Sequence, residues 1–341
     1  MFAIGRKRQF LMLLPVLCVM AAALGCSSKT GDTDITTDFL EDTVVAVGTQ
    51  RVSLAEWYLY AMPKVSAATA MYGSDIWKYR ISDDEGSMAD AVKQDILDQI
   101  VYIKIVCARA ETLGISLNED ELTDIETETL SYMERLTESQ KSRYSITEDV
   151  VHSVYCDNML AMKVYENLTL NIDTDVPDEE VRHMVIEYIC ADKFFETGED
   201  SKEKYSDEEL DGIRSIVEDL YIRAADDPEI TKLSQLGNEQ YAAIEMVSDY
   251  AGLREKFPDE IADKIFNMRE NEILGIFDTD ESYFIFDCVK RNDEEATNEA
   301  KVGIIEQRQR ELFEQSYAVW QEETVIKLNY TIWDAIGFYT R

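Results

Sequence analysis

The stretch Phe257–Val289, FPDEIADKIFNMRENEILGIFDTDESYFIFDCV, contains the pattern that decides the fold of this chain. Its first part has apolar residues at helical spacing, at Ile261, Ile265 and Met268. Its second part has two runs of β-branched and aromatic residues on either side of the polar residues 278–281. Such an arrangement is typical of a β-hairpin. The stretch therefore predicts a helix, a reversal and two antiparallel strands.

The composition bounds the size and chemistry of the protein. The chain has 341 residues, 45% of them hydrophobic, which is enough for two domains with cores of their own. A net charge of −36 argues against nucleic acid as a partner, because phosphate binding needs a basic surface. The two histidines, His152 and His183, are too few for a multi-histidine metal site. Phosphate loops, nucleophile motifs and metal-binding clusters are absent from the sequence, so no cofactor and no metal is expected.

Residues 1–25 are expected to be a secretion signal and not part of the fold. Basic residues 6–8 precede a short apolar run that ends in small residues. Cys26, directly after Gly25, resembles the acylated cysteine of the bacterial lipobox, and residues 26–42 are polar enough for a flexible tether. The alternative is an ordinary signal peptide with an incidental cysteine. We therefore expect an exported lipoprotein anchored to the outer face of the cell membrane.

Four further cysteines, Cys107, Cys156, Cys190 and Cys288, are sparse and have no CxxC spacing. This pattern suggests neither a zinc site nor a disulfide scaffold. We expect buried free thiols, although an exported location also permits disulfides.

The first half of the chain is dominated by helical patterns. A short strand at Val44–Val47 precedes a helix that Ser53 caps, and a long amphipathic helix follows at Met88–Leu113. Asn118 and Ser145 are expected to cap a third and a fourth helix.

The second half mixes strands and helices. Met184–Cys190, MVIEYIC, predicts a central strand. An acidic loop is expected at residues 196–205, then a helix at residues 206–224, then short helices and loops at residues 225–256. After the hairpin we expect a long helix, followed by a strand at Val325–Ile332, where apolar and polar residues alternate.

The helix and hairpin resemble the last third of a parvulin-type peptidyl-prolyl isomerase domain. Asn271-Glu272-Ile273 stands where that family has Gly-Glu-Ile, and Ser282–Phe286 stands where it has Gly-Tyr-His-Ile-Ile. Upstream, Leu113-Gly114-Ile115 before the cap at Asn118 is similar to the N-terminal chaperone domain of SurA-like and PrsA-like extracytoplasmic foldases. The resemblance spans roughly residues 43–335.

This resemblance implies an α+β fold that is mostly helical. A SurA-N-like helical chaperone domain would cover residues 43–175, and a C-terminal helix and strand at residues 294–341 would pack back on it. A small parvulin-like α/β domain would be inserted between them, at residues 176–293.

The resemblance also implies a degenerate catalytic site. The family has two histidines that face each other across adjacent strands, and Phe284 stands at the second of these positions. Two registers are open for the first position: Glu187, which gives the better-centred strand and which we favour, or His183. No residue is therefore assigned a catalytic role.

Four apolar residues are the expected substrate-binding residues. Phe257 and Ile261 stand at positions of the family's proline groove, with Phe266 beneath them and Phe284 on the last strand. The alternative, that Phe257, Ile261 and Phe266 are ordinary core residues, carries about equal weight.

The leading hypothesis is a membrane-anchored extracytoplasmic foldase or chaperone that binds unfolded or folding exported polypeptides. Its isomerase domain is expected to be inactive or weak. One alternative is an active peptidyl-prolyl cis-trans isomerase that dispenses with the histidines, and another is a non-catalytic structural or adhesive lipoprotein. Contact with the membrane is expected through the lipid anchor only, nucleic acid is not expected as a partner, and a homodimer is left open.

Overall fold

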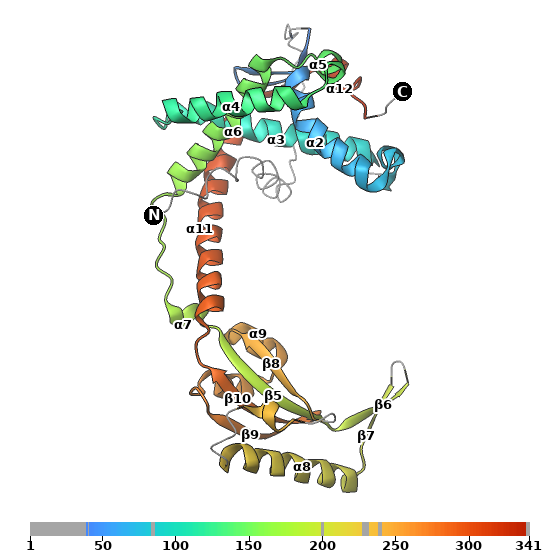
Figure 1. Cartoon of the computed structure of the whole chain (residues 1–341), viewed down its shortest axis with the longest axis vertical. Coiled ribbons are helices and arrows are strands. Elements are labelled where there is room, and N and C mark those ends of the chain that lie inside the picture. Colours follow the sequence, from blue (N-terminus) through green and yellow to red (C-terminus); the bar gives the residue numbers. More distant parts are fainter. Residues whose placement is uncertain are drawn as a thin grey trace. The chain divides into compact units, whose positions relative to one another are not determined.

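The computed structural model describes residue 39 and residues 41–82, 86–198, 201–226, 232–237 and 241–338. The expected signal segment, Cys26 and most of the expected tether lie outside the described residues. The chain is mostly helical with several small antiparallel sheets, so the predicted α+β class is confirmed (Figure 1). It divides into two compact units, which we call unit 1 (residues 1–171 and 310–341) and unit 2 (residues 172–309). Each unit has its own hydrophobic core.

Unit 1 is built mainly from helices. They are α2 (Leu54–Tyr72), the 3₁₀ helix η2 (Ser74–Lys78), α3 (Met88–Ala110), α4 (Glu119–Arg135), α5 (Glu138–Tyr144), α6 (Glu148–Thr169), the later part of α11 (Glu294–Glu323) and α12 (Tyr330–Trp333). In α3, Ile96, Ile100 and Ile103 are fully buried, as their helical spacing predicts. The long amphipathic helix is therefore the centre of this core.

Helix caps in unit 1 follow the sequence with one exception. The Ser53 side chain accepts a hydrogen bond from the backbone N–H of Glu56, and Asn118 forms a reciprocal capping box at the start of α4. Ser145 does not cap the fourth helix, so that prediction is wrong. It ends α5 in a left-handed conformation with φ 53°, and Thr147 caps α6 instead. The cause is the short helix α5, which the sequence reasoning did not predict.

A three-stranded sheet of unit 1 joins distant parts of the sequence. Its order is β11 (Ile326–Leu328), β1 (Thr43–Val47) and β2 (Gln50–Ser53), all antiparallel. The strand expected at Val325–Ile332 is wrong in its second half, because the chain turns into α12 after three strand residues. The small hairpin β3 (Arg80–Ser82) and β4 (Gly86–Ser87) completes the strands described in this unit.

Unit 2 is organised around a four-stranded antiparallel sheet. The strand order is β8 (Ala243–Ser248), β5 (Met184–Asp192), β10 (Ser282–Lys290) and β9 (Ile273–Asp278). Around it lie α7 (Asp178–Val181), α8 (Asp207–Asp226), the 3₁₀ helix η3 (Leu233–Gln235), α9 (Tyr250–Lys256) and α10 (Asp259–Phe266). The helix and hairpin predicted within residues 257–289 are thus present as α10, β9 and β10.

Two elements of unit 2 differ from the prediction. The hairpin β6 (Phe194–Gly198) and β7 (Ser201–Lys204) replaces the expected acidic loop, and β8 lies where only short helices and loops were expected. Both are exposed or lie at an edge, so their sequences lack the clear alternation that marks a half-buried strand. Pairing with neighbouring strands stabilises them instead.

The sheet has a core on each face. Ile186, Phe286 and Cys288 lie on one face beneath α9 and α10, whereas Ile189 and Ile285 lie on the other beneath α8 and η3. Figure 1 shows α8 along one side of the sheet and α9 on the other. Because side chains alternate along a strand, a register difference of one residue decides which core a side chain joins.

Candidate functional site

Five rings form one connected cluster on the face of the sheet beneath α9 and α10. We call this group the aromatic cluster: Tyr188 from β5, Phe257 from the α9–α10 junction, Phe277 from β9, and Phe284 and Phe286 from β10. The face of the sheet that carries it is called the aromatic face.

Phe257 is the hub of the cluster. Its ring stands edge-on to Phe286, Tyr188 and Phe284, with centroid distances of 5.0, 5.4 and 5.6 Å. Its backbone N–H donates to the carbonyl of Leu253 at 2.8 Å, which fixes the turn between α9 and α10. Each edge-to-face pair contributes about 0.5–1.5 kcal/mol beyond the burial of area. The site is therefore rigid at its centre.

The outer part of the cluster is accessible. Phe257, Phe286 and Tyr188 are buried, but Phe277 and Phe284 are only partly buried. Cα pairing places Phe284 opposite Phe277 on one side and opposite Cys190 on the other, and Cys190 is also partly buried. Phe277, Phe284 and Cys190 thus form an apolar row across three strands, which we call the open row.

The expectation that Glu187 faces Phe284 is wrong. In the observed register Phe284 pairs with Cys190, whereas Glu187 pairs with Asp287 and points to the opposite face. The strand itself was correctly placed, but the alternation along it puts Tyr188 and Cys190, not Glu187, beside the phenylalanines.

His183, the residue of the other register, does not lie in the strand either. It precedes β5, its backbone N–H donates to the Thr297 hydroxyl at 3.0 Å, and its Nδ1 lies 2.9 Å from the carbonyl of Val181. The second histidine, His152, is in unit 1 on α6, with Nδ1 3.6 Å from the Cys156 sulfur. Neither histidine is therefore among the residues of the aromatic cluster.

The other predicted binding residues are mostly core residues. Phe257 and Ile261 are 3% and 7% exposed. Phe266 is partly buried beneath the guanidinium of Arg182, 3.9 Å from its ring centroid. Of the four predicted binding residues, only Phe284 belongs to the open row.

Sequence reasoning missed Tyr188, Phe277 and Cys190. The signal that could have found them is the alternation in MVIEYIC, which puts Tyr188 and Cys190 on one face, combined with the hairpin, which pairs Phe277 with Phe284. Glu187 was favoured because its register centres the strand and leaves room for the preceding helix, but that choice took no account of which face of the strand each side chain occupies.

The aromatic face offers little acid–base chemistry. Burial is the main cause that raises the pKa of the Cys190 thiol to about 11, so it stays protonated near neutral pH. Its Sγ lies 3.4 Å from Oδ1 of Asp192, which accepts a hydrogen bond from the Ser282 hydroxyl at 2.7 Å. A protonated thiol is a poor nucleophile and a poor base.

Two lysines lie at the rim of the aromatic cluster. The Lys256 Nζ is 4.7 Å from the Tyr188 ring centroid and the Lys264 Nζ is 5.2 Å from that of Phe277. Both lysines are exposed. Each ammonium group lies over the face of an aromatic ring, at a distance typical of a cation–π contact.

A pair of acids lies on the opposite face, beside η3. Glu187 and Asp287 are 3% and 0% exposed. Glu187 accepts hydrogen bonds from the backbone N–H and hydroxyl of Ser234 at 2.7 and 2.9 Å. Among the described residues no well-formed hydrogen bond reaches either oxygen of Asp287. Burial, and then the charge of Glu187, raise the pKa of Asp287 to about 6. They outweigh the nearby Leu233 backbone N–H and the charge of Lys232, which act to lower that pKa.

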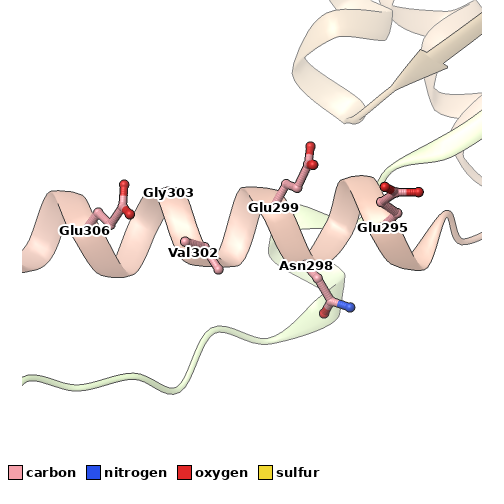
Figure 2. Close-up of a pocket in the computed structure, with 6 residues that line it drawn as sticks. All are labelled: Glu295, Asn298, Glu299, Val302, Gly303 and Glu306. Carbon is pink, nitrogen blue, oxygen red and sulfur yellow. The ribbon is translucent and has the colours of Figure 1, made fainter. Parts of the chain in front are cut away.

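Other features of the described residues point away from a second site. Figure 2 shows a shallow hollow whose six lining residues, including Glu295, Glu299 and Val302, all come from the single helix α11. Groups of three or more metal-ligating side chains do not occur in the described parts of the chain. Cys107, Cys156, Cys190 and Cys288 are free thiols, of which Cys288 is fully buried.

Comparisons with known proteins give a structural likeness and no sequence match. No protein-family model matches the chain, and a search of curated proteins finds no match.

None of the helices in the described ranges combines the length and apolar character needed to cross a bilayer.

The chain is similar in structure to SurA-like chaperones and PrsA foldases. A structure from work on PEB4 and Cj1289, described as SurA-like chaperones of Campylobacter jejuni, matches 84% of this chain and 99% of its own, at 9% identity and a TM-score of 0.30. PrsA of Lactococcus lactis matches 85% of this chain and 96% of its own, at 11% identity and a TM-score of 0.32. PrsA of Streptococcus pneumoniae matches 63% and 77%, at 12% identity and a TM-score of 0.22. Scores this low carry no argument about what the chain binds or catalyses.

Proposed function

We propose that this protein is an extracytoplasmic foldase or chaperone that binds unfolded exported polypeptides on the aromatic face, with little or no isomerase activity. The observation that carries the proposal is the pairing of Phe284 with Cys190. At the accessible part of the face, this pairing leaves an apolar row where the resembled family has a pair of histidines. Such a surface can bind apolar side chains but offers little for acid–base catalysis.

The open row provides the driving force for binding. Phe277, Phe284 and Cys190 are partly exposed and lie on a rigid sheet. Covering apolar surface gains about 25 cal/mol per Å², and little entropy is lost where the site is already ordered. An unfolded chain exposes apolar side chains that a folded protein hides, so the row prefers unfolded clients.

Catalysis needs more than this surface provides. The barrier to rotation about a peptide bond is about 18–20 kcal/mol, and a catalyst must stabilise the twisted amide more than the planar one. The histidines lie elsewhere, and the Cys190 thiol remains protonated near neutral pH. We therefore infer binding as the main activity.

We further propose that acyl chains on Cys26 hold the protein at the outer face of the membrane. The basic residues 6–8, the apolar run after them and the Gly25-Cys26 junction support this. Two acyl chains on one cysteine provide stable anchoring, which a single chain does not. In cells fed a radiolabelled fatty acid, Cys26→Ser should abolish labelling and release the protein from the membrane fraction.

The domain organisation is proposed as two parts. A helical chaperone domain would comprise residues 43–175 and 294–341, and the parvulin-like domain would comprise residues 176–293. The break of the compact units near residue 171 supports the first boundary, whereas the second break, at residue 310, lies later than the proposed one and assigns the first half of α11 to unit 2.

The binding proposal is tested by suppression of aggregation. Reduced α-lactalbumin is a suitable unfolded probe, with light scattering as the readout. Phe277→Ser and Phe284→Ser, alone and together, should reduce suppression several-fold, because each removes partly exposed aromatic area from the open row. Val302→Ser on α11 is the matched control, since Val302 is 53% exposed and lies outside the row. Equal protection by the double variant and the parent protein would refute the role of the aromatic face.

An active isomerase is the second candidate, favoured by one observation. Asp192, Ser282 and Cys190 place polar atoms directly beside Phe284. A proline tetrapeptide assay separates the two functions. We expect a rate equal to that in buffer. A faster rate that Phe257→Ala abolishes would establish catalysis and overturn the inactive assignment.

A further inference from the structure

Strand β8 is an edge strand of the four-stranded sheet. It pairs with β5 on one side and is the last strand in the order. Its six residues, Ala243–Ser248, include Ile244 and Val247, which are 46% and 50% exposed. Both edge strands contact helices on the faces of the sheet, β9 with α8 and β8 with α9 and η3. No strand among the described residues pairs with the outer side of β8, and two of its apolar side chains are half exposed.

Edge strands expose unpaired backbone groups and normally carry protection. Lysine, proline or a bulge at the edge prevents pairing with another chain. The sequence of β8, AIEMVS, contains neither lysine nor proline, and its register with β5 runs without a bulge from Ala243 to Ser248. The chain has acidic residues in abundance elsewhere, yet Glu245 is the single charge on this strand. The edge is therefore suited to accept another strand.

The apolar surface continues from the aromatic cluster to this edge. Phe286 pairs with Tyr188, and Tyr188 pairs with Ile244, so the three side chains form one row across β10, β5 and β8. A strand added beside β8 would lie at the end of this row. Alternate side chains of the added strand would extend the aromatic face, and the others would lie on the face of Glu245.

The charge of Glu245 favours one kind of strand beside β8. Glu245 is exposed, makes no ion pair among the described residues, and faces the already acidic Glu187 across the strands. A second copy of the chain would bring its own Glu245 and a net charge of −36 to the same edge, which opposes self-pairing. A segment with a basic residue at this position would be attracted.

We propose that β8 binds an extended apolar segment of an unfolded polypeptide as an added antiparallel or parallel strand, with a basic residue of that segment opposite Glu245. The inference rests on the proposed function and specifies how the client is held. Backbone hydrogen bonds would give affinity for any extended sequence, and contacts of the side chains on the two faces would give preference for some sequences over others. Addition of a client strand would use the unpaired side of β8, which is continuous with the aromatic face.

The test uses fluorescein-labelled peptides and the full chain. The parent peptide has valine at alternate positions, threonine between them and one central lysine in a threonine position. In an extended strand, successive backbone N–H groups point to opposite edges. Two versions carry N-methyl groups at one or the other alternate set of amides. One version should bind like the parent, and the other should bind at least about tenfold more weakly, equivalent to ~1.4 kcal/mol.

Protein variants test the side-chain part of the inference. Glu245→Lys should reverse the preference, so that a peptide with glutamate in place of lysine binds better than the parent peptide. Ile244→Lys and Val247→Lys should each weaken binding of the parent peptide several-fold without unfolding the sheet, because both side chains are half exposed. Equal affinity of the two N-methylated peptides, or an unchanged preference in Glu245→Lys, would overturn the inference.

The outcome is separable from that of the proposed function. If the chain suppresses aggregation through the open row but does not distinguish the two N-methylated peptides, the foldase proposal stands and the edge inference fails. If neither the aromatic variants nor the edge variants change suppression, the foldase proposal fails as well. A difference in affinity between the two N-methylated peptides supports the inference whether or not the aromatic variants change the suppression of aggregation.

Discussion

The two units bury acidic side chains in opposite ways. In unit 1, Lys104 Nζ lies 2.7 Å from Glu56 Oε1 and 2.5 Å from Asp157 Oδ2, and Lys104 and Glu56 are both almost fully buried. In unit 2, Glu187 and Asp287 are buried together, and neither forms an ion pair among the described residues. Unit 1 thus holds its buried acids with a buried lysine, whereas in unit 2 Glu187 is held by the backbone N–H and hydroxyl of Ser234.

The difference teaches how each unit tolerates buried charge. Burial alone would lower the pKa of Lys104, but the charges of Glu56 and Asp157 outweigh it and raise that pKa, so the lysine stays charged. For Asp287, burial and the charge of Glu187 outweigh the Leu233 backbone N–H and the charge of Lys232, and its pKa rises to about 6. Burial raises the pKa of Glu56 as well, in spite of Lys104. We therefore expect unit 1 to depend most on the buried lysine and unit 2 to depend on the protonation of Asp287.

The largest effect is expected from Lys104→Met. It leaves Glu56 and Asp157 buried without a cation, which should lower the free energy of unfolding of unit 1 by about 3–5 kcal/mol. Urea unfolding followed by hydrogen exchange of α3 peptides measures the loss. The control is Lys64→Met, which removes the more exposed pair with Asp95 and should cost about 0–1 kcal/mol. Similar losses for both variants would contradict the comparison.

An intermediate effect is expected from Asp287→Asn, and it depends on pH. Because the pKa of Asp287 is raised in the folded chain, its contribution to stability is fully present below about pH 4 and is lost as the pH rises through about 6. The asparagine variant should therefore stabilise unit 2 at pH 8 by about 2–3 kcal/mol and give no gain at pH 4. Urea unfolding at both pH values, followed by hydrogen exchange of β10 peptides, measures it.

The control for this pH dependence is Glu260→Gln, an exposed carboxylate on α10. It should leave the stability of unit 2 within about 0.5 kcal/mol at both pH values. A stabilisation by Asp287→Asn that is equal at pH 4 and pH 8 would show that the effect is not protonation of this carboxyl.

The smallest effect is expected from Ser234→Ala. It removes the hydroxyl that donates to Glu187 but keeps the backbone N–H that donates to the other carboxylate oxygen. A loss of about 1 kcal/mol is expected from unit 2. A double-mutant cycle with Glu187→Gln measures the coupling, and a coupling near zero would show that η3 does not hold the acid in place.

Much of the fold could be predicted from local patterns. The helical period placed α3, the caps at Ser53 and Asn118 placed two helix starts, and the turn at residues 278–281 placed the β9–β10 hairpin. These features depend on interactions within a few residues, so the sequence carries them directly. β6, β7 and β8 were missed, since pairing with other strands and not their own alternation makes them strands.

The candidate site was predicted in part. Phe284 lies on the last strand, as predicted, but the residue opposite it is Cys190 and not Glu187. A shift of a few residues in the register of β5 changed both the partner and the face. Sequence reasoning also missed Phe277 and Tyr188, because their strands become neighbours of β10 only in the folded sheet.

The sequence by itself determined the apolar last strand, the helix before it and the acidic character of the chain, because composition and local periodicity are properties of the chain alone. Tertiary structure decided which residues meet across the sheet, which strands form its edges and which buried acids pair with a buried lysine. These depend on strand register and on packing between residues far apart in the sequence. A difference of one position along a strand turns a side chain from one face of the sheet to the other.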